Sequence, residues 1–315
     1  MLKFGAVNID VSHPKMFAEE LMKGERGRYT AVYNDGFRGD DEVKAFAEKF
    51  SLKICQTLDE LVDSVDIGFI HGCNWDKHMG YAEHFIKKNK PVFIDKPMVG
   101  NMEECRKLIE LAQKGVPVIG TSALRYCDEA VRVRRTMEEQ KTRAIHVDVT
   151  VGVDEFNYAI HAVEEICAIV NDKPISCRHI SAAEVDGEVC DTFLIKFKNS
   201  ATACYHSLLK KFAMFNTIVL TANPEYNTDF CFEVDNSKIY RAMLDVVCDY
   251  LEGKENILGT MEEMVDAIKI MIAGKASKEN GGIEVAFDNP LMETTSYDGY
   301  EFEKNYSASA KKIYL

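Results

Sequence analysis

Long apolar runs, cysteine pairs and an excess of basic residues are all missing from this sequence. No apolar stretch approaches the ~20 residues that a membrane-spanning helix needs, and the chain enters a strand-like pattern at once, without a signal peptide. Its ten cysteines stand singly, with no Cys-x-x-Cys pair, which argues against a zinc knuckle or redox pair and indicates reduced thiols. The 51 acidic residues outnumber 38 basic ones, giving a net charge of −13, which argues against a nucleic-acid surface. We therefore expect a cytoplasmic protein that acts on a small molecule, without a metal, nucleic-acid or membrane partner.

Glycines are missing from the first turn of the chain. An apolar run over residues 4–7 leads into a polar turn and a helix opened by Pro14, which is how a dinucleotide-binding unit starts. The glycines of a GxGxxG fingerprint would fall on Asn8, Asp10 and His13. Asp10 adds negative charge where the pyrophosphate should lie, so cofactor binding is weakened unless this side chain turns away.

The start of the first helix offers a partial substitute for those glycines. Free N–H groups and the helix dipole favour anions at this point. We expect Ser12 to cap the helix and His13 to donate to a phosphate.

What is present predicts two domains within 315 residues. In the first 120 residues, short apolar runs alternate with amphipathic helix patterns, as where "YTAVYN" precedes "DDEVKAFAEKF". This alternation predicts an α/β domain over residues 1–122, a Rossmann-like doubly wound parallel sheet whose ligand crevice lies beyond the C-terminal strand ends.

From about residue 144 the pattern changes to short strands around one helix, followed by two further helices and a polar, aromatic tail. We expect residues 123–315 to form an α+β domain with a mostly antiparallel open sheet, with disorder confined to loops and the tail. An apolar outward face on that sheet would need covering, which predicts a homo-dimer or homo-tetramer formed through it.

Several stretches resemble one family in the expected order along nearly the whole chain. They are "VFIDKPMVGNMEECRKLIELA", "CNWDKHMGYAEHFIKKNKPVF", "ALRYCDEAVRVRR", "NYAIHAVEEICAIV" and the C-terminal helix pair. Together they are similar to the glucose–fructose oxidoreductase/inositol dehydrogenase (Gfo/Idh/MocA) family of nicotinamide-dependent oxidoreductases. The resemblance implies the two-domain fold, NAD or NADP as cofactor, and a hydroxyl-bearing small molecule as substrate.

The resemblance assigns catalysis to Lys96 and His161, with Asn157 where the family has an aspartate. A lysine at a strand end can hydrogen-bond a substrate hydroxyl and assist proton transfer. An amide can orient a hydroxyl but cannot act as a base. The alternatives are a surface lysine paired with Asp95 and a core histidine with a local partner.

The expected cofactor-binding residues follow the strand ends. They are Asn8, Asp10, Ser12, His13, Asn34, Asp35, Arg38, His71, Asn74, His78, Asp95, Lys96 and Pro97. An acid at the end of the second strand favours NAD. Arg38 could accommodate a 2′-phosphate instead, and Pro97 fits a fixed turn with a cis bond before it.

The expected substrate residues are Trp75, Arg125, Tyr126, Asn157 and His161. Trp75 would stack on a ring or sugar, and Arg125 would hold a hydroxyl or carboxylate. The alternative for Arg125 is a salt bridge to an acid, and for His78 a local partner at a helix start.

The function expected is an NAD(P)-dependent dehydrogenase or reductase acting on a sugar, polyol or related molecule. The alternative is a non-redox relative that binds a ligand or regulates, with cofactor binding weakened or lost.

Overall fold

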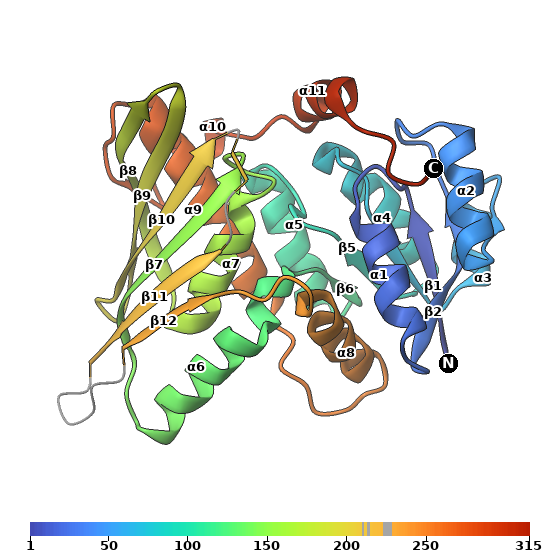
Figure 1. Ribbon diagram of the computed structural model, residues 1–315, viewed down its shortest axis with the longest axis horizontal. Helices are drawn as coiled ribbons and strands as arrows, with labels where there is room; N and C mark the ends of the chain where they lie inside the picture. Colours follow the sequence, from blue (N-terminus) through green and yellow to red (C-terminus); the bar gives the residue numbers. More distant parts are fainter. Residues whose placement is uncertain (210, 213–214, 223–228) are drawn as a thin grey trace.

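A computed structural model describes residues 1–209, 211–212, 215–222 and 229–315 (Figure 1). Residues 2–119 contain a parallel six-stranded sheet. Each strand except β3 (Lys53–Ile54), whose two residues are exposed, is a short, mostly buried run, and all pairs are parallel. The order is β3 (Lys53–Ile54), β2 (Gly27–Tyr33), β1 (Leu2–Val7), β4 (Ile67–Ile70), β5 (Val92–Ile94) and β6 (Val118–Ile119). The strand order reverses between β1 and β4, which places the ligand crevice of a doubly wound sheet beyond these strands' C-terminal ends.

Amphipathic helices connect these strands. They are α1 (His13–Met22), α2 (Asp40–Phe50), α3 (Leu58–Ser64), α4 (His78–Lys87) and α5 (Met102–Gln113), with a 3₁₀ turn η1 (Trp75–Lys77) before α4. The Rossmann-like doubly wound fold is confirmed. Our boundary between residues 122 and 123 stays a prediction, bracketed by the end of β6 at Ile119 and the start of β7 at Ala144.

The second sheet has seven strands and is mostly antiparallel, as expected. Its order is β12 (Phe230–Glu233), β11 (Asn216–Thr221), β7 (Ala144–Val153), β10 (Thr202–Leu209), β9 (Glu188–Phe197), β8 (Pro174–Val185) and β13 (Val285–Ala286). Among the described pairs, β7 and β10 alone run parallel.

Two helices, α7 (Ala159–Val170) and α9 (Met261–Glu279), lie against one face of this sheet (Figure 1). Every residue of α7 is buried. The element η2 (Ala123–Tyr126) packs on α7 and on α8 (Ile239–Leu251), α6 (Asp128–Glu139) packs on α7 and η2, and α8 packs on α1.

The opposite face of the second sheet is less apolar than we expected. It carries half-buried polar side chains such as His146, Asp148 and His206 beside the exposed Ile218 and Leu220. Assembly through this face therefore stays a prediction. None of the described helices is both long and apolar enough to cross a membrane.

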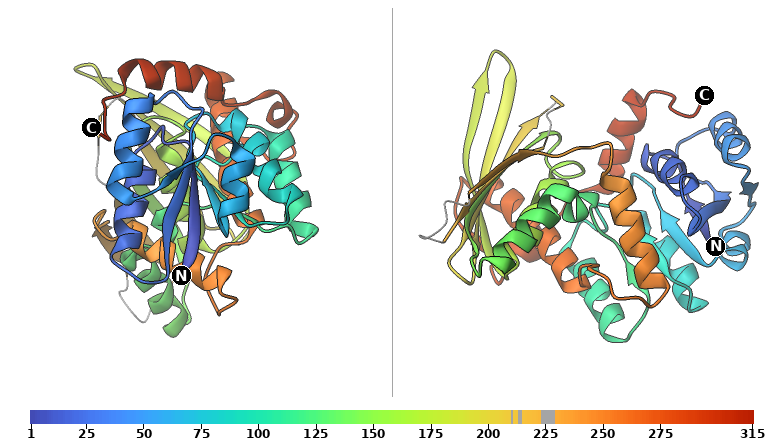
Figure 2. Two further views of the ribbon diagram at one scale, coloured as in Figure 1. Left: turned by 90° about the vertical axis from the view of Figure 1, so that its right-hand side faces the viewer. Right: turned by 60° about the horizontal axis from the view of Figure 1, so that its bottom comes forward.

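The C-terminal segment is ordered, contrary to our expectation of a disordered tail. After α10 (Leu291–Thr294), the chain forms α11 (Gly299–Ser309) and ends in an extended stretch. Figure 1 shows α11 and the C terminus on the side of the first sheet opposite the N terminus, and Figure 2 shows α11 crossing above that sheet.

Candidate active site

Asp95, the first residue after β5, is buried and joins three strand ends. Its Oδ2 lies 2.7 Å from His13 Nδ1 and 2.8 Å from His71 Nδ1, and its Oδ1 accepts from the Lys96 backbone N–H at 2.8 Å. Tyr29 Oη lies 2.7 Å from the other ring nitrogen of His71. Burial would raise the pKa of Asp95, but the two imidazoles outweigh it and hold that pKa well below its usual value. Asp95 is therefore an ionised carboxylate that orients His13 and His71.

Lys96 points from the end of β5 toward the second domain. It precedes a cis peptide bond to Pro97, as expected. Its Nζ donates to Asn157, to the main-chain oxygen at 2.8 Å and to Oδ1 at 3.1 Å, and lies 5.9 Å from the centre of the Tyr158 ring. Desolvation lowers the pKa of the ammonium group, although Asp95 opposes this. The structure thus brings together Lys96 and Asn157, which are 61 residues apart.

His161 lies on the first turn of α7 and is 6% exposed. Its Nδ1 is 2.7 Å from Ser122 Oγ, and its ring is 6.3 Å from the His13 ring. Burial lowers the pKa of His161 well below its usual value, and the charges of Lys96 and His13 add to this. His161 is therefore neutral at pH 7. Asn157 lies in the turn that precedes α7.

The buried side chain of Asp10 holds the first turn in place. This side chain is 1% exposed; Oδ1 accepts from Phe37 N and Oδ2 from Cys73 N, both at 3.1 Å. A Cβ on Gly36 would lie 2.1 Å from Asp10 Oδ1, so this glycine makes room for the carboxylate. Asn8 has φ of 64° and accepts from the backbone of the loop after β2. Asp10 thus ties the turn after β1 to the loops after β2 and β4.

The start of α1 does not present the expected anion donors. Ser12 occupies the N-cap position but its side chain makes no capping hydrogen bond. His13 points inward to Asp95 and stacks on Phe17, with ring centres 5.3 Å apart. Ser12 therefore occupies the expected capping position without capping the helix through its side chain. His13 contacts Asp95 and lies near His161 instead of facing a phosphate.

The end of β2 is held by internal contacts. Asn34 accepts from Ile9 N and donates to the carbonyl oxygen of Arg38, both at 3.1 Å. Asp35 accepts from Tyr81 Oη at 2.6 Å. Arg38 is 5% exposed, pairs with Glu42 at 3.1 Å and donates twice to the carbonyl oxygen of Asp10.

The residues expected after β4 are buried in packing contacts. Trp75 is 2% exposed and donates from Nε1 to the carbonyl oxygen of Tyr297 at 2.8 Å. His78 lies between the carbonyl oxygens of Gly72 and Met98, at 2.8 and 3.0 Å, which matches the local-partner alternative. Trp75 packs within the protein instead of lining an open crevice.

Arg125 is committed to a buried ion pair. Its Nη1 lies 3.1 Å from Glu164 Oε2, and its Nη2 lies 3.4 Å from Glu263. Tyr126 Oη accepts from Gly259 N at 3.1 Å. These contacts match the salt-bridge alternative, since a substrate would have to displace Glu164 to reach the guanidinium group.

Contacts from the C-terminal segment to the predicted crevice were missed in the sequence. Arg38 Nη1 donates to the carbonyl oxygen of Lys311 at 2.7 Å, and Tyr314 Oη donates to that of Val11 at 2.7 Å. Glu303 accepts from Asn74 at 2.9 Å. The only signal in the sequence is the tail's content of tyrosine, lysine and glutamate, which does not reveal where the tail binds.

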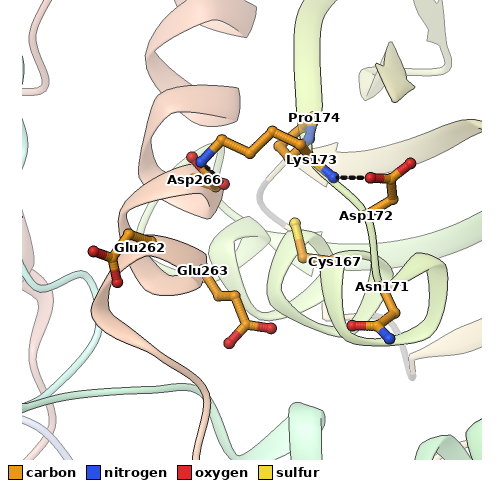
Figure 3. A pocket seen from close by; sticks show the side chains of 8 residues that line it. All are labelled: Cys167, Asn171, Asp172, Lys173, Pro174, Glu262, Glu263 and Asp266. Atoms are coloured by element: carbon orange, nitrogen blue, oxygen red, sulfur yellow. Dashed lines mark hydrogen bonds and ion pairs between the residues drawn. The ribbon is translucent and has the colours of Figure 1, made fainter. Parts of the chain in front are cut away.

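A cavity of about 260 Å³ lies elsewhere, between the end of α7 and the start of α9 (Figure 3). Four of its eight lining residues are acidic, and Lys173 pairs with one of them, Asp266, at 2.8 Å. None of the predicted site residues lines this cavity; its residues are Cys167, Asn171, Asp172, Lys173, Pro174, Glu262, Glu263 and Asp266.

Comparison with known proteins agrees with this architecture. Residues 14–121 match the model of the Gfo/Idh/MocA oxidoreductase family, described as an NAD-binding Rossmann fold. No curated protein sequence matches the chain significantly.

Solved dehydrogenase structures share the fold at low identity. The myo-inositol dehydrogenase of Lactobacillus casei, solved with NAD(H) and myo-inositol, is 12% identical, with a TM-score of 0.75 over 93% of this chain and 99% of that one. A probable dehydrogenase from Thermotoga maritima is 16% identical, with a TM-score of 0.73 over 91% and 99%. The UDP-N-acetylglucosamine 3-dehydrogenase of Acidithiobacillus ferrooxidans is 11% identical, with a TM-score of 0.70 over 88% and 97%. Each is matched almost completely, whereas part of this chain is left unmatched.

Residues 14–121 are thus similar to the NAD-binding Rossmann domain of the Gfo/Idh/MocA oxidoreductase family, and the chain as a whole shares its fold with the solved dehydrogenases.

Proposed function

We propose that this protein is an NAD(P)-dependent oxidoreductase that transfers hydride between nicotinamide and the hydroxyl or carbonyl carbon of a sugar, polyol or related small molecule. The observation that carries the proposal is the cluster of Lys96, Asn157 and His161 where the first sheet's C-terminal edge meets α7. These side chains come from both domains, as a site between a cofactor domain and a substrate domain requires.

The chemistry of this cluster suits proton transfer at a substrate oxygen. Lys96 has a pKa lowered by desolvation, and His161 is neutral, so one can donate a proton and the other accept one near pH 7. Asn157 can orient a hydroxyl group through its amide. When bound, a nicotinamide supplies the hydride acceptor or donor.

His13 is assigned to the same cluster instead of to phosphate binding. It is held by the ionised Asp95 at 2.7 Å and faces His161. An aspartate that fixes the orientation of an imidazole is a common support for proton transfer. We infer that the Asp95–His13 pair positions the polar wall of the site.

The adenosine half of a dinucleotide does not fit the crevice as it stands. Asp10 fills the first turn, and Arg38 is taken by Glu42, by the Asp10 carbonyl oxygen and by the C-terminal segment. Because Arg38 is not free for a 2′-phosphate and Asp35 lies at the end of β2, NAD is favoured over NADP.

The filled adenosine half of the crevice also favours a second candidate function. A non-redox relative would keep the two-domain fold and bind a small ligand at the Lys96 cluster, with Asp10 and the C-terminal segment closing the former dinucleotide crevice. The two candidates differ in whether a dinucleotide binds at all.

Turnover tests the catalytic assignment. With NAD⁺ and a panel of polyols and sugars followed by NADH absorbance, Lys96→Ala should lower kcat about 10²–10⁴-fold while NADH binding is retained. Lys107→Ala, which removes an exposed lysine paired with Glu103, is the matched control and should leave kcat unchanged. Full turnover in Lys96→Ala would contradict the role given to this lysine.

A further inference from the structure

We propose that residues 299–315 are a built-in inhibitor that occupies the adenosine half of the dinucleotide crevice and must leave before the cofactor binds. This inference rests on the proposed function, because it concerns the same cofactor. Three separate groups of contacts, one at each strand end that a dinucleotide would touch, support it.

The first group covers the turn after β1, where the pyrophosphate would lie. Tyr314 Oη donates to the carbonyl oxygen of Val11 at 2.7 Å. The Tyr314 ring packs edge-on to Phe46, with centres 5.2 Å apart, and lies 5.9 Å from the Arg38 guanidinium carbon. The terminal aromatic ring therefore lies between the first turn and α2.

The second group covers the start of α2, next to the strand end that would bind the adenosine ribose. Arg38 Nη1 donates to the carbonyl oxygen of Lys311, and Ile313 N donates to Glu42 Oε1 at 3.3 Å. Lys312 pairs with Asp41. These contacts use both members of the Arg38–Glu42 pair, so the segment and a ribose would compete for the same place.

The third group covers the loop after β4. The Glu303 carboxylate is held by Lys77 Nζ at 2.9 and 3.0 Å and by Asn74 Nδ2 at 2.9 Å, as a bound anion would be. A carboxylate oxygen of Asp10, the sulfur of Cys73 and a carboxylate oxygen of Glu303 lie within 4.8 Å of one another. Removing Glu303 would therefore free two anion donors and take one negative charge away from the pyrophosphate position.

The segment is also lightly packed, which suits a part that leaves. Of the residues in α11, all of them described, only Gly299 is buried, whereas α9 has thirteen buried residues. An element with little buried apolar surface separates at a lower free-energy cost than the core does. The segment is held by its polar contacts and by three aromatic contacts, of Phe302 with Trp75, Tyr306 with Phe37 and Tyr314 with Phe46.

Full-length variants test the inference. Glu303→Gln and Tyr314→Ala each remove one anchor, and we expect each to tighten NADH binding about tenfold, measured by cofactor fluorescence. Glu301→Gln, the loss of an exposed carboxylate on the same helix, is the control and should bind like wild type. Melting temperatures of all variants verify that they are folded.

The outcomes separate this inference from the proposed function. If wild type and variants bind NADH equally tightly, the inhibitory role is overturned and the oxidoreductase stands. If none of them binds NADH at millimolar concentration, both are overturned. Hydrogen exchange gives an independent readout: saturating NADH should speed exchange of the Ile313 amide, and unchanged exchange would contradict displacement.

Discussion

At the scale of single residues, several side chains expected in the site turn out to serve the fold. Trp75 and His78 are buried in packing contacts, while Asp10 links three loops. The sequence shows the residue types at these positions, but the direction in which each side chain points depends on contacts with loops far away in the sequence. Lys96 and His161 differ: desolvation moves the pKa of Lys96 down toward pH 7, and the lowered pKa of His161 keeps its imidazole neutral and able to accept a proton.

Glu165 gives a residue-scale prediction on stability. It is buried on α7, where Oε1 accepts from Thr217 Oγ1 at 2.9 Å and Oε2 has no partner among the described residues. Burial raises the pKa of Glu165 to about 8. The folded state therefore binds more protons than the unfolded state between about pH 4.5 and 8, so stability falls as pH rises through this window.

Glu165→Gln removes this loss. Relative to wild type, we expect it to be stabilised by about 1–3 kcal/mol at pH 8 but not at pH 5, measured by urea unfolding. The exposed Glu262→Gln serves as the control for loss of one carboxylate. An equal effect of Glu165→Gln at both pH values would show that this group does not titrate on folding.

At the scale of elements, Arg125 links η2 to α7 and to the start of α9. Arg125→Met would leave the buried Glu164 without its partner, and we expect a loss of about 3 kcal/mol in the free energy of unfolding. Arg125→Met combined with Glu164→Gln should recover part of that loss. A raised KM with unchanged stability would instead show that Arg125 binds substrate.

Short and long elements differed in how well the sequence predicted them. The periodic pattern of "DDEVKAFAEKF" coincides with α2, Asp40–Phe50. The two-residue strands β3 and β13 offer too few positions for any periodicity, and they were missed. Helix α11 was missed because a polar stretch with a single buried residue has no apolar face to recognise.

At the scale of the whole molecule, the alternation of strands and helices in the first 120 residues and its change to short strands from about residue 144 were sufficient to predict the two-domain fold. The order of the strand ends also predicted which side chains converge, as Asp95, His13 and His71 do. The position of the C-terminal segment over the crevice could not be predicted, because its contacts join residues about 300 positions apart, such as Val11 and Tyr314.

The central claim is that this crevice still binds a nicotinamide dinucleotide. Titration of the purified full-length protein with NADH and NADPH, followed by cofactor fluorescence, tests it directly. The account predicts saturable binding, tighter for NADH than for NADPH and tighter still in Glu303→Gln. Failure of both cofactors to bind at millimolar concentration, in wild type and in Glu303→Gln, would contradict it and favour the non-redox relative.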